Sequence, residues 1–198
     1  MNRDFAVVIL AAGLGTRMKS RHAKVLHHAG GRALIELVVS TATRLVPADL
    51  VYVVVGHQAG VVRHTVASCG VRFIEQKEQL GTGHAVLVGR GELDRAAPRL
   101  LVLYGDCPLV REETLAALMR RHIESRAAAT VLTTHLPDPT GYGRILRDQH
   151  GGLTGIVEEK PATPAQRAVR EINSGIYCFE TGPLFECLAG LRPDNPAA

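Results

Sequence analysis

The alternation of apolar runs with helix-like segments constrains the fold of this chain most strongly. Three short runs are rich in Val, Ile and Leu, at residues 5–11, 50–55 and 99–104, and residues 71–75 also favour a strand. Between and after them, four segments favour helices: residues 34–45, 58–68, 82–88 and 112–123. Strands that are apolar on both faces belong in a parallel sheet whose two sides are covered by helices. We therefore expect an α/β fold with a Rossmann-like, mostly parallel sheet.

The pattern changes after residue 127. Strand-like segments now follow one another with turn residues between them, at residues 130–136, 144–147, 153–159 and 171–179. A short helix or loop is expected at residues 161–168. We interpret these strands as mixed or antiparallel additions to one side of the same sheet. The sequence thus predicts a single domain over residues 1–198, with one half at 1–127 and the other at 128–192.

Composition limits the classes of protein that need to be considered. Of 198 residues, 46% are hydrophobic and 21% are charged, which is typical of a globular chain. Aromatic residues make up 4% and Trp is absent, so the stacking platforms of single-strand nucleic-acid binders are not expected. The four cysteines have no metal-ligand spacing and read as reduced thiols of a cytoplasmic protein. No apolar run approaches the length of a membrane span.

The segment Leu10 to Lys24, LAAGLGTRMKSRHAK, follows the first expected strand. Gly13 and Gly15 allow backbone N–H groups to approach a ligand closely, and four cations lie nearby. We interpret the segment as a phosphate-binding loop; a tight turn before a solvated basic loop is the alternative. It is not a Walker A loop, because Ala rather than Gly precedes Lys24. A dinucleotide fingerprint is also disfavoured, because Met18 stands where its third glycine would be.

Asp106 follows the expected strand at residues 99–104, in the sequence LYGDCPL. The carboxyl ends of parallel strands meet at one edge of a sheet, so Asp106 should lie near the glycine loop. Mg²⁺ typically takes one or two carboxylates together with phosphate oxygens. Asp106 is therefore a candidate magnesium ligand; the alternative is an Asp-x-Pro turn whose carboxylate binds only backbone N–H groups.

Four further loops place polar side chains beside glycines. Gln76 precedes LGTGH, and its amide can both donate and accept, which suits the reading of a base edge. Residues 138–144, 155–160 and 171–175 supply the amide, carboxylate and close backbone that a sugar requires. Taken alone, Glu158, Lys160 and Asn173 are better explained by a surface ion pair and a turn.

These motifs resemble those of the bacterial N-acetylglucosamine-1-phosphate uridylyltransferases. The segments LAAGLGTRM, KVLH, EQLGTGHAV, LYGDCPL, DPTGYGRI, GIVEEK and EINSGIY occur in the order and spacing of that family, from about Val7 to Phe179. The resemblance implies a nucleotide-diphospho-sugar transferase fold with a nucleotide-binding first half and a sugar-binding second half. It implies a cytoplasmic transferase that makes UDP-N-acetylglucosamine, a precursor of cell-wall peptidoglycan, and pyrophosphate from UTP and N-acetylglucosamine 1-phosphate, with Mg²⁺.

The resemblance also implies roles for individual residues. Arg17 and Lys24 would be catalytic, binding phosphates and offsetting charge on the departing pyrophosphate. Leu10, Ala11, Ala12 and Gly13 would contact the nucleotide, and Gln76, Gly81 and Thr82 would bind its uracil. Tyr104 and Gly105 would border the sugar and the ribose, and Asp106 would bind Mg²⁺. Gly143, Glu158 and Asn173 would bind the N-acetylglucosamine group.

The sequence departs from the family in three respects. Ala23 replaces the usual proline before the catalytic lysine, which we expect to loosen the loop. The family's domain continues past residue 198, so we expect a chain shortened at its C-terminus and lacking a later asparagine that shares the metal. The family's β-helical acetyltransferase half, on which trimerisation rests, is missing, so we expect a monomer. The alternatives are a transferase for another nucleotide or sugar phosphate, and a UDP-sugar-binding fragment without full activity.

Overall fold

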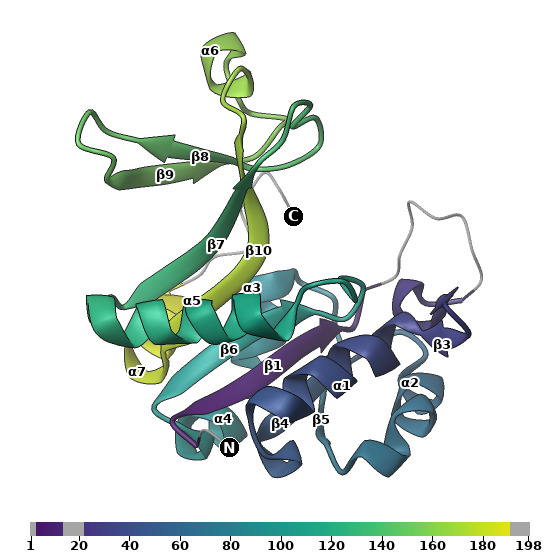
Figure 1. The fold of residues 1–198 in the computed structure, drawn as a ribbon. Coiled ribbons are helices and arrows are strands. Elements are labelled where there is room, and N and C mark those ends of the chain that lie inside the picture. Colours follow the sequence, from purple (N-terminus) through teal and green to yellow (C-terminus); the bar gives the residue numbers. More distant parts are fainter. Residues whose placement is uncertain (1–2, 14–21, 191–198) are drawn as a thin grey trace. The chain divides into compact units, whose positions relative to one another are not determined.

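The computed structural model describes residues 3–13 and 22–190 (Figure 1). The chain divides into two compact units. The described residues of the first unit fall within Met1–Thr130 and Tyr177–Pro193, and those of the second fall within Val131–Ile176.

A mostly parallel sheet forms the centre of the first unit. Strand β1 (Phe5–Ala11) lies between β4 (Val51–Val55) and β6 (Arg99–Tyr104), and β5 (Arg72–Glu75) pairs with the far side of β4. All three of these pairings are parallel. The last residues of β10 (Glu171–Glu180) run antiparallel to β6. This topology confirms the expected α/β class.

Helices cover both faces of this sheet. Helices α1 (Leu34–Leu45) and α5 (Glu112–Ser125) pack side by side, and α3 (Thr82–Leu87), α4 (Arg90–Ala96) and α7 (Thr181–Ala189) group together on the opposite face (Figure 1). Helix α2 (Ala59–Thr65) follows β4. The first five residues of β1 are fully buried, which explains why its apolar run has no polar interruption.

The second unit is built from antiparallel strands. Strand β8 (Arg144–Arg147) pairs antiparallel with β9 (Leu153–Val157), and Ile172 of β10 lies opposite Arg144. Strand β7 (Ala129–His135) also pairs with β10, and the short helix α6 (Pro164–Arg167) follows β9. The segment expected as a strand to residue 159 leaves the strand conformation after Val157.

Several elements lie outside the sequence-based expectations. Helix α4 buries only Leu93, so its sequence shows no apolar period. Helix α7 contains Gly182 and Pro183 in its first turn, where a proline is tolerated because its missing N–H has no helical partner. A two-strand hairpin, β2 (His28–Ala29) and β3 (Arg32–Ala33), turns through two glycines with positive φ.

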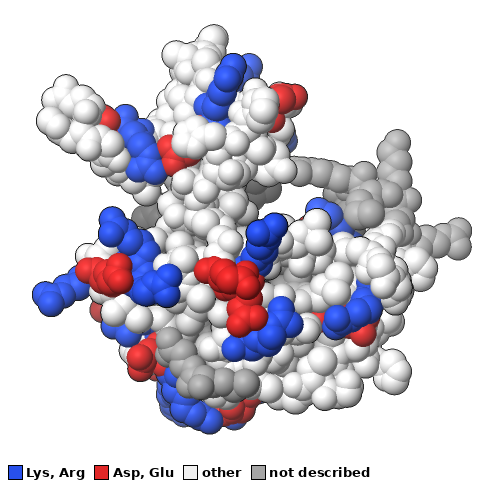
Figure 2. Space-filling view, viewed as in Figure 1, with Lys and Arg blue, Asp and Glu red and all other residues white. Residues whose placement is uncertain are grey.

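The charged surface and the cysteines of the described residues do not indicate a particular binding partner. On the face shown in Figure 2, basic and acidic side chains of the described residues are interspersed rather than separated by sign. All four cysteines are free thiols, and burial raises the pKa of Cys178 to about 12. Within the described part of the chain, every helix is too short or too polar to cross a membrane.

Candidate active site

A cavity of about 310 Å³ opens at the carboxyl ends of the parallel strands of the first unit. Its walls come from four segments that are far apart in the sequence. The lining residues are Leu10, Ala11, Ala12, Gly13, Lys24, Val25, Gln76, Gln79, Gly81, Thr82, Ala85, Tyr104 and Asp106. Ligands of open α/β sheets bind at this edge, so the cavity is a candidate nucleotide site.

A lysine and an aspartate meet in this cavity. Lys24 begins the short 3-10 helix η2 (Lys24–Leu26), and Asp106 follows the end of β6. The Lys24 Nζ lies 2.5 Å from the Asp106 Oδ2, and the two side chains are 47% and 20% exposed. The structure thus brings together one predicted phosphate-binding cation and the predicted metal ligand. The other predicted cation, Arg17, lies outside the described residues.

The backbone before Lys24 is anchored to the start of α2. The Ala23 N–H donates to the Gln58 Oε1 at 2.8 Å, and Ala23 is completely buried. Gln58 has a φ of +55°, which places its side chain at a sharp entry to the helix. The Ala23 N–H thus makes a hydrogen bond that a proline at this position could not make, and the expected loosening of the loop stays a prediction.

Gln76 lines the cavity and is held there by several hydrogen bonds. It follows β5, is 3% exposed, and its N–H donates to the Val55 carbonyl at 2.8 Å. Its side-chain Nε2 donates to the Gly81 carbonyl at 3.2 Å and lies 3.1 Å from the Nδ1 of His84. Gly81 adopts a φ of +95°, a conformation that only glycine takes without strain.

Gly105 lies closely packed at the end of β6. Its N–H donates to the Leu10 carbonyl at 2.9 Å and joins the ends of β6 and β1. A Cβ at this position would lie 3.0 Å from the Cδ1 of Ile35 and 3.0 Å from the Cγ1 of Val25. A side chain at this position would crowd Ile35 and Val25, so glycine favours the close packing of this turn just before Asp106.

The three residues expected to hold a sugar lie together within the second unit. The Asn173 N–H donates to the Gly143 carbonyl at 2.8 Å. A Cβ on Gly143 would lie only 2.9 Å from the Glu158 Oε1, so the carboxylate rests directly against this glycine. The Asn173 Oδ1 accepts the Gly175 N–H at 2.9 Å, which orients the amide. The amide of Asn173 and the carboxylate of Glu158 thus both lie at Gly143, and their role in binding a sugar stays a prediction.

A buried arginine supports this group from behind. Arg144 is 1% exposed, and its Nη2 lies 2.6 Å from the Glu159 Oε2 while its Nη1 donates to the Tyr142 carbonyl. The Glu159 Oε2 also accepts the Gly141 N–H at 3.3 Å. The hydrogen bond from Arg144 lowers the pKa of the Glu159 carboxyl. The pair thereby ties the loop before Gly143 to the segment that carries Glu158.

Some lining and supporting residues were not anticipated from the sequence. Val25, Gln79 and Ala85 line the cavity, and His84 contacts Gln76 without lining it. Gln79 and His84 belong to the motif EQLGTGHAV, but their residue types alone do not indicate a role in the cavity. Their roles depend on how the loop folds back over Gln76, which a spacing pattern does not reveal.

The donor set at Asp106 fits a metal that arrives with phosphate. Among residues 3–13 and 22–190, no group of three or more His, Cys, Asp or Glu side chains could hold a metal by itself. A Mg²⁺ that is bound largely by phosphate oxygens and water needs only one or two carboxylates. Asp106 faces the cavity and can supply one, so the residues present fit a nucleotide-borne Mg²⁺ rather than a metal held by protein alone.

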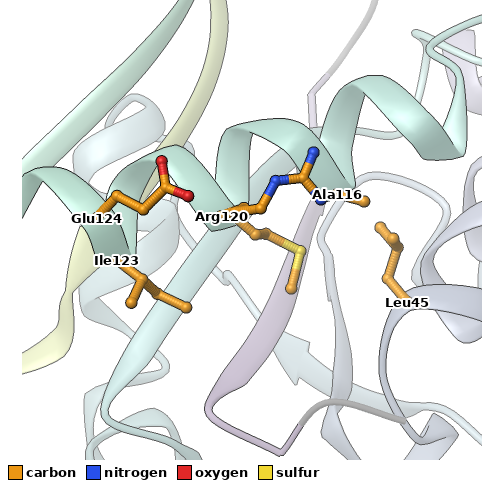
Figure 3. Close-up of a pocket in the computed structure, with 6 residues that line it drawn as sticks. Leu45, Ala116, Arg120, Ile123 and Glu124 are labelled. Atoms are coloured by element: carbon orange, nitrogen blue, oxygen red, sulfur yellow. The ribbon is translucent and has the colours of Figure 1, made fainter.

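A second cavity, of about 390 Å³, lies between α1 and α5 (Figure 3). Its lining is Leu45, Ala116, Met119, Arg120, Ile123 and Glu124. It is larger than the first cavity, but it lies along helix surfaces rather than at strand ends and contains no residue that the sequence singles out. The smaller cavity is therefore the better candidate for a nucleotide.

The fold and the position of the cavity indicate the class of protein to which the chain belongs. The first unit has a mostly parallel sheet with a cavity at its strand ends, which is where open α/β folds bind nucleotides and other ligands. The sequence model of the MobA-like NTP transferase domain matches residues 7–168, and the chain belongs to this family.

Curated relatives agree with this assignment. The chain is 53% identical over 197 residues to the bifunctional protein GlmU of Solibacter usitatus and 49% identical to that of Koribacter versatilis. These alignments cover 100% and 98% of the chain, but the chain spans only 42% of the length of either relative.

Two solved structures share the fold. The first is a Bacillus anthracis protein assigned as a glucose-1-phosphate thymidylyltransferase, with a TM-score of 0.78, 19% identity, and coverage of 96% of this chain and 76% of that one. The second is HddC of Yersinia pseudotuberculosis, with a TM-score of 0.71, 23% identity, and coverage of 91% and 79%.

Proposed function

We propose that this chain is a uridylyltransferase that forms UDP-N-acetylglucosamine and pyrophosphate from UTP and N-acetylglucosamine 1-phosphate. The observation that carries the proposal is the cavity at the strand ends, where the glycine-loop residues, Lys24, Gln76 and Asp106 line one space. The identity of about 50% to the GlmU proteins over nearly the whole chain supports the choice of nucleotide and sugar.

The proposed chemistry needs no nucleophile from the protein. A phosphate oxygen of the sugar 1-phosphate attacks the α-phosphorus of UTP, the bond to the β-phosphate oxygen breaks, and pyrophosphate leaves. The protein contributes by holding two anions in line and by offsetting the charge that builds on the leaving group. Lys24, with Arg17, supplies that positive charge, and the backbone of residues 10–13 holds the nucleotide.

Asp106 holds the divalent cation in this proposal, and Mg²⁺ would supply Lewis acidity and fix the orientation of the phosphate oxygens. Gln76, Gly81 and Thr82 bind the uracil, and Tyr104 and Gly105 border the ribose and sugar. In the second unit, Gly143, Glu158 and Asn173 bind the N-acetylglucosamine group.

Pyrophosphate release tests the proposal. The purified chain is incubated with UTP, N-acetylglucosamine 1-phosphate and Mg²⁺, and pyrophosphate is measured against reactions lacking the sugar phosphate or the metal. Turnover that needs all three components is expected. Binding of UDP-N-acetylglucosamine without turnover would identify a binding module instead. Faster turnover with another nucleotide or sugar phosphate would replace the substrates proposed here.

The proposal includes a cytoplasmic, monomeric chain whose product serves cell-wall peptidoglycan synthesis. Four free thiols are consistent with a reducing compartment. Light scattering on the purified chain tests the monomeric state, and a mass of twice or three times that of one chain would contradict it.

A further inference from the structure

We propose that His84 sets the base preference of the cavity by holding the Gln76 amide with its oxygen toward the ligand. This inference rests on the proposed function, because it assumes that a nucleobase binds beside Gln76. His84 itself is absent from the cavity lining, so it acts through Gln76 and is a positioning residue.

The Gly81 carbonyl fixes which end of the Gln76 amide faces the loop. The Gln76 Nε2 lies 3.2 Å from the Gly81 oxygen, and a carbonyl can only accept a hydrogen bond. A flipped amide would place two oxygens against each other and lose this bond. The Nε2 must therefore point at Gly81.

His84 then uses the second amide hydrogen. Its Nδ1 lies 3.1 Å from the same Nε2. Since that nitrogen is a donor, the Nδ1 must accept, and the ring is the neutral tautomer that carries its proton on Nε2. Both hydrogens of the Gln76 amide are thus occupied within the protein, and the amide cannot rotate without breaking two bonds.

The Gln76 Oε1 is left as the group available to a ligand. No described residue donates a hydrogen bond to this oxygen, and Gln76 lines the cavity. An oxygen accepts only, so it matches the imide N–H of uracil. Cytosine presents a lone pair at the corresponding ring nitrogen and would leave the oxygen facing an acceptor.

The burial and the backbone hydrogen bonds of Gln76 keep it from moving to accommodate a base other than uracil. The residue is 3% exposed, and its backbone is held on both sides, by its own N–H on Val55 and by the Gln79 side chain, which donates to its carbonyl at 3.2 Å. A buried group that is left with a mismatched partner is penalised more strongly than one that merely lacks a contact. We therefore expect His84 to affect the choice between bases more than the strength of phosphate binding.

Three variants test the inference. His84→Phe keeps a planar ring but removes the acceptor. His84→Asn returns an acceptor close to the position of the Nδ1. His64→Phe is the matched control, because His64 is exposed on α2 and is absent from the cavity lining. For each protein, kcat/KM is measured with UTP and with CTP, and binding of both nucleotides is measured by calorimetry.

In His84→Phe we expect the ratio of kcat/KM for UTP to kcat/KM for CTP to fall at least tenfold. The value for UTP should fall, and the value for CTP should stay unchanged or rise. The KM for the sugar phosphate should stay unchanged. His84→Asn should recover most of the preference, and the control should match the wild type. An unchanged preference in His84→Phe, or a loss of both nucleotides to the same degree, would overturn the inference.

A spectroscopic measurement separates this inference from a general effect on folding. The ¹⁵N shifts of the His84 ring should show a protonated Nε2 and an unprotonated Nδ1 in the free protein. A protonated Nδ1 would contradict the proposed hydrogen bond. If the wild type binds neither UTP nor CTP, the proposed function fails together with the inference. If the wild type binds UTP and His84→Phe binds it with the same selectivity, only the inference fails.

Discussion

Asp106 carries the largest share of the proposed chemistry among single residues. It is the acidic side chain of the described cavity lining, and it meets Lys24 at 2.5 Å. Because the Lys24 side chain is 47% exposed, the pair contributes only about 0–1 kcal/mol to folding. We infer that the pair is retained for what it binds rather than for stability.

Replacing Asp106 should therefore separate activity from stability. In Asp106→Asn we expect pyrophosphate release to fall about 100-fold or more, in line with the loss of one preorganised charge-stabilising group. The melting temperature should change little. Asp94→Asn is the control, since Asp94 pairs with Arg90 on α4 and does not line the cavity. Wild-type turnover in Asp106→Asn would remove the residue from the mechanism.

Ala23 offers a second test at the residue scale. Its φ of −54° would accept proline, whose stiffness adds roughly 0.4–1 kcal/mol of stability at compatible positions. Proline would also remove the buried N–H that donates to Gln58, at a cost of about 1–3 kcal/mol. We expect the loss to dominate, so that Ala23→Pro is destabilised by about 1 kcal/mol in urea unfolding.

A double-mutant cycle checks the cause of that loss. In a Gln58→Ala background the same Ala23→Pro change should be neutral or stabilising, because the acceptor has already gone. An equal destabilisation in both backgrounds would show that the hydrogen bond is not responsible.

At the scale of elements, strands β8 and β10 are joined by a bidentate ion pair. The Arg147 Nη2 and Nε donate to the two carboxylate oxygens of Glu171 at 2.6 and 2.8 Å. These hydrogen bonds lower the pKa of Glu171 from its ordinary value of 4.5 to about 2. Glu171 begins β10 just before the segment that carries Asn173, so the pair fixes the start of that strand.

The ion pair of Glu171 makes the stability of the folded chain fall as the pH falls. The folded pKa lies below the unfolded one, so the unfolded chain binds the extra proton first as the pH falls. The stability from Glu171 is complete above about pH 4.5 and is lost between that value and about 2. Amide exchange in β8 and β10, corrected for intrinsic rates, should quicken over this range in the wild type. In Glu171→Gln the change should be much smaller; an equal change would assign it to other groups.

The elements were predictable where the apolar pattern was strong. The bounds of β1, α1 and β6 agree with the sequence-based expectation, because each has an uninterrupted apolar run or a clear helical period. Helix α4 and the hairpin of β2 and β3 were missed, because neither buries enough apolar residues to leave a pattern.

The candidate site was predictable to a similar extent. Asp106 and Gln76 could be placed after strands from the pattern, Lys24 belonged to the expected phosphate-binding loop, and all three line one cavity. The supporting contacts could not be anticipated. The bonds from Ala23 to Gln58 and from Gln76 to His84 join residues whose loops meet only in three dimensions.

At the scale of the whole molecule, the two units carry different parts of the proposed chemistry. The first unit contains the cavity with Lys24 and Asp106, and the second contains the group formed by Gly143, Glu158 and Asn173. The family model extends over most of both units, from residue 7 to residue 168. The division into a nucleotide-binding and a sugar-binding part remains a prediction that ligand mapping can test.

Backbone NMR of the whole chain during titration with UTP and Mg²⁺ tests the central claim most directly. We predict that the largest shift changes fall on the amides of Gly13, Gln76, Gly81 and Asp106, with little change at Ala116 and Ile123 between α1 and α5. Changes concentrated at that helix groove, or none at all at millimolar nucleotide, would contradict the assignment of the strand-end cavity as the nucleotide site.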